Sequence, residues 1–185
     1  QNNSLKDNTA KNITLFCDEF TSYNDTKAGV STILLLKSLG YSVRTYKHRE
    51  SGRALISQGM LRRAEAVAAA NIKALSPHVN LKQPLIGVEP SAILTFRDEY
   101  PGLLKGELRE EAQRISECCF TIEEFISKEA EKGNIDGNAF DSLERKIYLH
   151  GHCHQKALSS VDHSKKMLSI PAGNQVVEIE CGCCG

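Results

Sequence analysis

Short β-rich segments alternate along the chain with longer segments of helical periodicity, and this alternation limits the possible folds more than any other feature. The expected strands cover residues 13–17, 41–46, 84–88, 146–150 and 175–180. Helices are expected between several of these strands, over residues 28–39, 54–75 and 155–169. Strands that alternate with helices predict an α/β fold with parallel sheets, whose functional loops gather at the carboxyl ends of the strands.

The order strand, helix, strand, turn occurs twice. Cys17 ends the first strand and Ser51-Gly52 form a turn after the second, while Cys153 follows strand 146–150 and Cys184-Gly185 follow the last strand. We therefore expect a pseudo-symmetric, Rossmann-like pair of β-α-β units with parallel sheets. The half-repeats would span about 13–100 and 145–185, within one domain of residues 13–185. Residues 1–12 are polar and predict a disordered or added tail, and the stop inside a cysteine motif predicts truncation at the C-terminus.

The middle of the chain predicts a helical connector over residues 107–133. Its first helix would place Leu108, Ala112, Ile115 and Cys119 on one face. Thr121 and Glu124 form a capping box that predicts the start of a second helix, which would end at Gly133. Because free cysteine behaves as a small hydrophobe, we expect Cys118 and Cys119 to belong to the core.

Composition excludes several classes of protein. The chain has 185 residues with 23 Lys+Arg against 23 Asp+Glu, so its formal net charge is zero. Phosphate binding needs an excess of positive charge, so a nucleic-acid partner is not expected. No apolar run reaches the length of a membrane span, and residues 1–12 lack the apolar stretch of a signal peptide. These features predict a cytoplasmic protein without a transmembrane segment.

The seven cysteines point to chemistry beyond packing. A disulfide scaffold is not expected in a reducing compartment, which leaves thiols held for metal, cluster or redox chemistry. The strongest pattern is His150-Gly151-His152-Cys153-His154 together with Cys181-Gly182-Cys183-Cys184-Gly185, since both segments follow strands. Thiolates select zinc or iron–sulfur clusters over magnesium or calcium.

Several ligand sets remain open within this pattern. Cys153, Cys183 and Cys184 supply three thiolates, and the fourth ligand would be Cys181, a histidine of the first segment (His150, His152 or His154) or a residue beyond the end. Cys17 ends a strand at the same expected edge and fits either a ligand or a core residue. The alternative to a metal site is a buried, inert cluster of thiols.

Other candidate positions carry a weaker signal. Ser51-Gly52-Arg53 and Glu89-Pro90-Ser91 could present an arginine and a carboxylate at the loop edge, but such sequences more often form turns or helix caps. His48, His78 and His163 stand alone in polar stretches and are expected at the surface.

The segment His152-Cys153-His154-Gln155-Lys156, followed by Cys183-Cys184-Gly185, resembles the second half of the cysteine-rich CCG domain. Such domains occur in heterodisulfide reductases, in the iron–sulfur subunits of glycolate and lactate oxidation, and in the small subunit of anaerobic glycerol-3-phosphate dehydrogenase. The strongest likeness is to the C-terminal domain of fused FAD and iron–sulfur oxidoreductases. The resemblance covers residues 13–185 and includes residues 16–21, 51–53, 87–91 and 94–100.

The first half departs from the family pattern. Where the family has Cys-Cys-Gly-Arg, this chain has Glu50-Ser51-Gly52-Arg53, and where the family often has Glu-Pro-Ser-Cys it has Ala92 in the last position. Cys17 is the thiol that remains in that half, so no cluster is expected there.

The resemblance implies an electron-transfer domain of an FAD-linked oxidoreductase that acts on a 2-hydroxy acid such as D-lactate or glycolate. An iron–sulfur cluster, of the 4Fe-4S type, would be held by Cys153, Cys183 and Cys184, with Cys17 or Cys181 as the fourth ligand. FAD and ferredoxin-like segments would belong to other domains of the same protein or complex, through which the chain could associate with a membrane. This chain would carry no catalytic residue of the flavin reaction.

Two alternatives to electron transfer are open. Zinc in place of the cluster would make the chain a structural or docking module. Dithiol–disulfide exchange between Cys183 and either Cys181 or Cys153 is the other, although a ring closed by the adjacent Cys183 and Cys184 would be strained.

Overall fold

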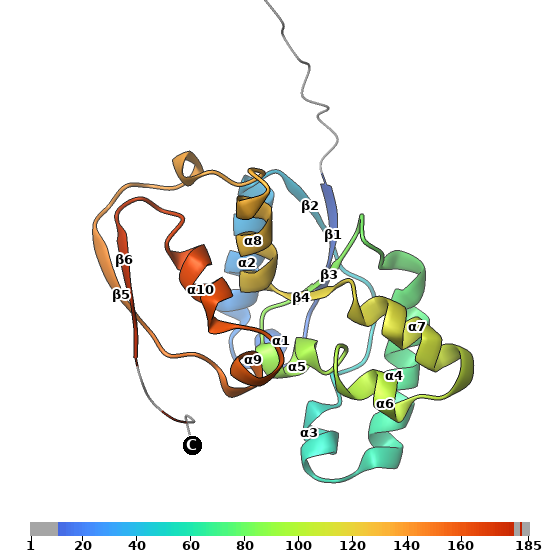
Figure 1. The fold of residues 1–185 in the computed structure, drawn as a ribbon. Coiled ribbons are helices and arrows are strands. Elements are labelled where there is room, and N and C mark those ends of the chain that lie inside the picture. The colour runs from blue at the N-terminus through green and yellow to red at the C-terminus, as the bar shows by residue number, and fades with distance from the viewer. Residues whose placement is uncertain (1–10, 180–181, 183–185) are drawn as a thin grey trace, which may run out of the picture.

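A four-stranded parallel sheet forms the centre of the protein in the computed structural model, which describes residues 11–179 and Gly182 (Figure 1). Its strands lie in the order β2-β1-β3-β4. Their bounds are β1 Lys11–Phe16, β2 Tyr41–Arg44, β3 Leu85–Gly87 and β4 Cys119–Thr121. All three pairings are parallel. The predicted α/β class with parallel sheets is confirmed.

Helices cover both faces of this sheet because alternate strand residues are apolar on both sides. Phe16, Leu85 and Cys119 pack with one helical layer, whereas Ile13 and Ile86 pack with the other. The first layer contains α4 (Leu61–Leu75), α6 (Glu99–Leu103) and α7 (Gly106–Ser116). The second contains α2 (Thr26–Ser38) and α8 (Ile122–Glu131).

A second, two-stranded parallel sheet is formed by β5 (Arg145–Leu149) and β6 (Asn174–Glu178). It lies on the outside of the second helical layer, where α10 (Val161–Leu168) packs against both α8 and β6 (Figure 1). Both expected β-α-β units are therefore formed, with parallel strands in each. They belong to separate sheets, because α8 and α10 fill the space between them.

Four further short α-helices occur among the described residues, and three of them begin just beyond a strand, while Ser76–His78 and Gly137–Ala139 form 3-10 turns. The four short helices are α1 (Glu19–Tyr23), α3 (Arg53–Ser57), α5 (Pro90–Leu94) and α9 (Cys153–Leu158). The helix expected over 54–75 is in fact α3 and α4, separated at Gly59, whose φ of 71° is left-handed. The helix expected over 155–169 is α9 and α10, and Ser160 caps the second of these by accepting from the Asp162 N–H.

Other sequence expectations had mixed outcomes. The capping box is confirmed, since the Thr121 hydroxyl accepts from the Glu124 N–H at 3.2 Å. The helical placement of Cys119 is wrong, because α7 ends at Ser116 and Cys119 begins β4. A strand of three residues is too short to show a period. Lys11 and Asn12, expected in the tail, belong to β1.

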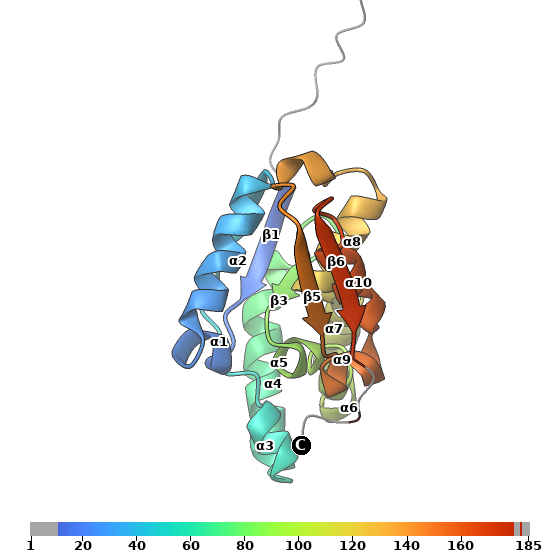
Figure 2. The same ribbon diagram turned by 90° about the vertical axis from the view of Figure 1, so that its left-hand side faces the viewer.

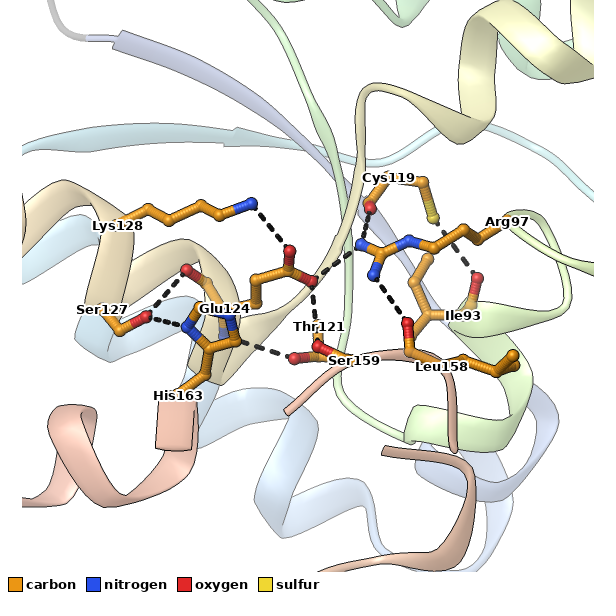
Figure 3. A network of polar contacts seen from close by, with 10 residues as sticks. All are labelled: Ile93, Arg97, Cys119, Thr121, Glu124, Ser127, Lys128, Leu158, Ser159 and His163. Carbon is orange, nitrogen blue, oxygen red and sulfur yellow. Dashed lines mark hydrogen bonds and ion pairs between the residues drawn. The ribbon is translucent and has the colours of Figure 1, made fainter. Parts of the chain in front are cut away.

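An ion pair between Arg97 and Glu124 joins three segments of the chain (Figure 3). The Arg97 guanidinium lies 2.7 Å from the carboxylate and also donates to the carbonyl oxygens of Cys119 and Leu158. Lys128 contacts the other carboxylate oxygen at 2.7 Å. Burial would raise the pKa of Glu124, but Lys128 and Arg97 outweigh it and lower that pKa. The contact fixes the end of α9 against β4 and α8.

We expect Arg97→Met to lower the free energy of unfolding by about 2 kcal/mol, since it leaves the buried Glu124 carboxylate with Lys128 as its one charged partner among the described residues. Urea denaturation of the full chain measures the change. Arg145→Met is the matched control, because Arg145 pairs with Asp141 in an exposed position and should have a much smaller effect. Equal losses in the two variants would contradict this role for Arg97.

Glu129 forms a cluster of hydrogen bonds at the amino end of β1, and we expect this cluster to be sensitive to acid. Its carboxylate accepts from Tyr41 at 2.8 Å and from Lys11 and Lys132 at 3.0 Å each. Burial would raise the pKa of Glu129, but these hydrogen bonds outweigh it and lower the pKa to about 2. A carboxyl with a depressed pKa stabilises the fold above its unfolded pKa, and that contribution disappears as pH falls toward the folded value.

The free energy of unfolding should therefore fall between about pH 5 and pH 2, and Glu129→Gln should flatten this part of the profile. Chemical denaturation at a series of pH values provides the measurement. A wild-type profile as flat as that of the variant would exclude this contribution.

Candidate functional site

The loops that follow β1, β3 and β5 meet at one end of the molecule. A cavity of about 600 Å³ lies there, lined by residues 18–21 after β1 and residues 88–92 after β3, together with Arg53 and His152. The chain runs from β1 to β2 on one side and reaches β3 on the other side of β1, so the cavity lies where the strand order reverses. Open α/β sheets commonly bind ligands at this point.

Glu89 and His152 connect the two halves of the chain across this cavity. One carboxylate oxygen of Glu89 accepts from the Ser91 hydroxyl and the Ala92 N–H, both at 2.6 Å, which caps α5. The other oxygen lies 3.5 Å from His152 Nε2. His152 Nδ1 accepts from the His154 N–H at 3.3 Å, so the neutral ring fits the tautomer with its proton on Nε2. Glu89 is thus a helix cap, as its sequence indicated, and also a neighbour of the His-Cys-His segment.

Cys153 is the first residue of α9, directly after the N-cap residue His152, and its side chain is half-buried. It lies at the carboxyl end of β5, whose last residue, Leu149, pairs with Glu178 at the end of β6. His150 follows β5 directly, and the rings of His152 and His154 lie 5.8 Å apart between centroids.

The predicted ligands Cys181, Cys183 and Cys184 lie outside the described residues. Within residues 11–179 and Gly182, no group of three or more His, Cys, Asp or Glu side chains is arranged to hold a metal ion. The ligand set therefore stays a prediction.

Cys17 lines a second cavity, of about 650 Å³, between the loop after β1, the loop after β2 and α4. His48 lines the same cavity, and its Nε2 accepts from the Cys17 N–H at 3.2 Å. His48 Nδ1 lies 2.7 Å from the Arg49 carbonyl oxygen, so both ring nitrogens contact the backbone. His48 is half-buried against the Phe16 ring, a contact that its polar sequence context did not reveal. Burial raises the pKa of the Cys17 thiol, and Asp18 raises it further.

Hydrogen bonds hold the loop at Ser51-Gly52-Arg53 after β2. Ser51, fully buried, donates from its N–H and its hydroxyl to the two oxygens of Glu19, at 2.8 and 2.6 Å. Tyr100 donates to the Ser51 carbonyl oxygen at 2.9 Å, and Asn71 donates to Tyr100 at 2.8 Å. Gly52 has a left-handed φ of 73°. Arg53 forms an ion pair with Glu99, so its main contact is structural.

The remaining cysteines and histidines have ordinary structural positions. Cys118 and Cys119 are buried, as expected, and burial raises the pKa of Cys119 to about 12. His78 stacks on Tyr46, and His163 Nδ1 lies 2.7 Å from the Ser127 hydroxyl.

The fold and the loop edge define a parallel α/β protein of the Rossmann-like class, with a half-buried thiol at the carboxyl end of its second sheet. Three curated proteins named D-2-hydroxyglutarate dehydrogenase are similar to it in sequence. The proteins of Pantoea ananatis (strain AJ13355) and Escherichia coli (strain K12) are 25% and 26% identical to it over 177 residues. That of Haemophilus influenzae (strain ATCC 51907 / DSM 11121 / KW20 / Rd) is 26% identical over 182 residues.

Each match covers 95% of this chain but only 16% or 17% of the relative. The chain therefore spans about one sixth of the length of these dehydrogenases. No family model and no solved structure matches it. In the part of the chain that the structure describes, no helix combines the length and the apolar character needed to cross a membrane.

The raised pKa of Cys17 predicts low thiol reactivity. At pH 7, alkylation of Cys17 by iodoacetamide should be slower in the folded chain than in the urea-unfolded chain. The rate in the folded chain should approach the rate in the unfolded chain only above the ordinary thiol pKa of about 8.5. Peptide mass mapping separates Cys17 from the other six cysteines. Equal rates at pH 7 in the folded and unfolded chains would show that burial does not protect this thiol.

Proposed function

We propose that this chain is a segment of a larger dehydrogenase that oxidises a 2-hydroxy acid, and that within it the chain is an electron-transfer domain with an iron–sulfur cluster. The similarity to three D-2-hydroxyglutarate dehydrogenases supports the oxidoreductase class and makes D-2-hydroxyglutarate the first substrate to test. Oxidation of the hydroxyl to a carbonyl releases two electrons and two protons. FAD, carried by the remainder of the protein, would accept the electrons first.

The shared carboxyl end of β5 and β6 is the observation that carries the electron-transfer proposal. The two strands are parallel and paired through Leu149 and Glu178, so the segments that follow them leave from the same edge. Cys153 lies in the first of these segments, and Cys181, Cys183 and Cys184 occur in the second. Soft thiolate donors of this number suit an iron–sulfur cluster, which when bound would supply one-electron transfer.

The residues of this chain would hold and orient that group. Cys153 and the Cys183-Cys184 pair would be the ligands, with Cys181 as the fourth. Cys17 suits the role of fourth ligand less well. It lines the cavity beside α4, and Cys153 is not among the described residues that line this cavity. His152 caps α9 and contacts Glu89, so it would position Cys153, whereas its use as a ligand would require release of these contacts.

The test uses the full-length polypeptide that carries this sequence, purified without oxygen. It should contain iron and show broad visible absorption beyond the flavin bands that bleaches on addition of D-2-hydroxyglutarate. Cys153→Ser should lower the iron content by the equivalent of one cluster per polypeptide, because one thiolate ligand of this domain is lost, while flavin reduction by the substrate persists. Cys118→Ala is the matched control: it changes a cysteine of the core and should retain the iron.

Stoichiometric zinc, with iron and visible absorption unchanged by Cys153→Ser, would favour the structural module instead. An iron content in Cys153→Ser equal to that of the wild type would exclude Cys153 as a ligand. Failure of D-2-hydroxyglutarate to reduce the flavin, with iron present, would reject this substrate while leaving the electron-transfer role intact.

A further inference from the structure

One face of the β5–β6 sheet is exposed in the structure. Figure 2 shows β5 and β6 facing the viewer, with the helices behind them. Lys165 on α10 lies 3.9 Å from Glu178, which places the Glu178 side of the sheet toward α10. The neighbouring residues of the pair, Tyr148 and Val177, share the opposite face because side chains alternate along a strand.

This outer face has an apolar centre. Tyr148 is 61% exposed, Val177 lies beside it in the register, and Ile179 just beyond β6 is 43% exposed. Lys146 extends over the Tyr148 ring with its ammonium group 5.2 Å from the ring centroid. An aromatic ring with aliphatic neighbours and a polar edge is typical of the centre of a docking surface.

Parallel sheets are nearly always covered on both faces, since their strands carry apolar side chains on both sides. The central sheet follows this rule, with a helical layer on each face. The β5–β6 sheet has two strands. Helix α10 packs against its inner face, and Figure 2 shows no described helix over its outer face. From the α4 side, the layers are helices, the central sheet, helices α2 and α8, helix α10, and the β5–β6 sheet, and a further layer is expected outside β5 and β6.

We infer that the outer face of β5–β6, centred on Tyr148 and Val177, is the docking surface for another domain of the same longer polypeptide. The inference rests on the proposed function, in which this chain is one segment of a larger dehydrogenase. The similar dehydrogenases are about six times as long as the region matched, so most of such a polypeptide lies outside this chain. The docked segment would present apolar side chains to Tyr148 and Val177 and an acidic group to Lys146.

Photo-cross-linking in the full-length polypeptide tests this surface. Benzoylphenylalanine at position 148 should cross-link within one polypeptide to residues outside the 185 of this sequence. The same probe at Arg109, an exposed position on α7 on the other side of the central sheet, is the matched control and should give a much lower yield. Peptide mass spectrometry identifies the partner residues, and the apparent mass separates links within one polypeptide from links between two.

A second variant measures the strength of the contact. Loss of a buried aromatic side chain weakens a docked state, so Tyr148→Lys should increase the rate of limited proteolysis between this domain and the rest by about tenfold or more. Tyr23→Lys changes an exposed tyrosine of α1 and should leave that rate unchanged.

Cross-links from position 148 mainly to a second copy, or at the yield of position 109, would overturn the inference. Equal proteolysis of the two tyrosine variants would also overturn it. These outcomes are independent of the proposed function, because D-2-hydroxyglutarate oxidation and iron content are measured separately on the same preparations.

Discussion

The ion pair between Arg97 and Glu124 is the contact on which the placement of the candidate site depends. Glu124 is 5% exposed, and a carboxylate so buried needs a charged partner to remain ionised. Arg97 is this partner, and its guanidinium also donates to the carbonyl oxygen of Leu158 at the end of α9 and to that of Cys119 in β4. Since Cys153 begins α9 and Leu158 ends it, one guanidinium holds the candidate ligand helix against the central sheet.

The loops at the carboxyl ends of the strands are built differently in the two sheets. At the first, hydrogen bonds among Ser51, Glu19, Tyr100 and Asn71 hold the loop after β2, and the thiol of Cys17 is disfavoured as a thiolate by burial. At the second, Cys153 is half-exposed at the start of a helix. The contact between Glu89 and His152 joins these two ends, so the first end acts as a support for the second.

Sequence patterns predicted the long elements and the caps, because both depend on residues close together in the chain. The helix at 26–38, the capping box at Thr121 and the burial of Cys118 and Cys119 are of this kind. The three-residue strand β4 and the breaks at Gly59 and Ser159 were missed, since a period needs more residues than these provide. The contacts of Glu89 with His152, and of His48 with Cys17, join distant segments and leave no local signal.

The sequence by itself determined the parallel α/β class, the β-α-β order of each half and the presence of thiols after strands, since local periodicity decides which faces of an element are apolar. Tertiary structure alone decided that the halves form two sheets separated by α8 and α10, and that their carboxyl ends approach each other at Glu89 and His152. Strand pairing and charge pairing depend on which distant segments pack together, and periodicity within one segment does not encode that choice.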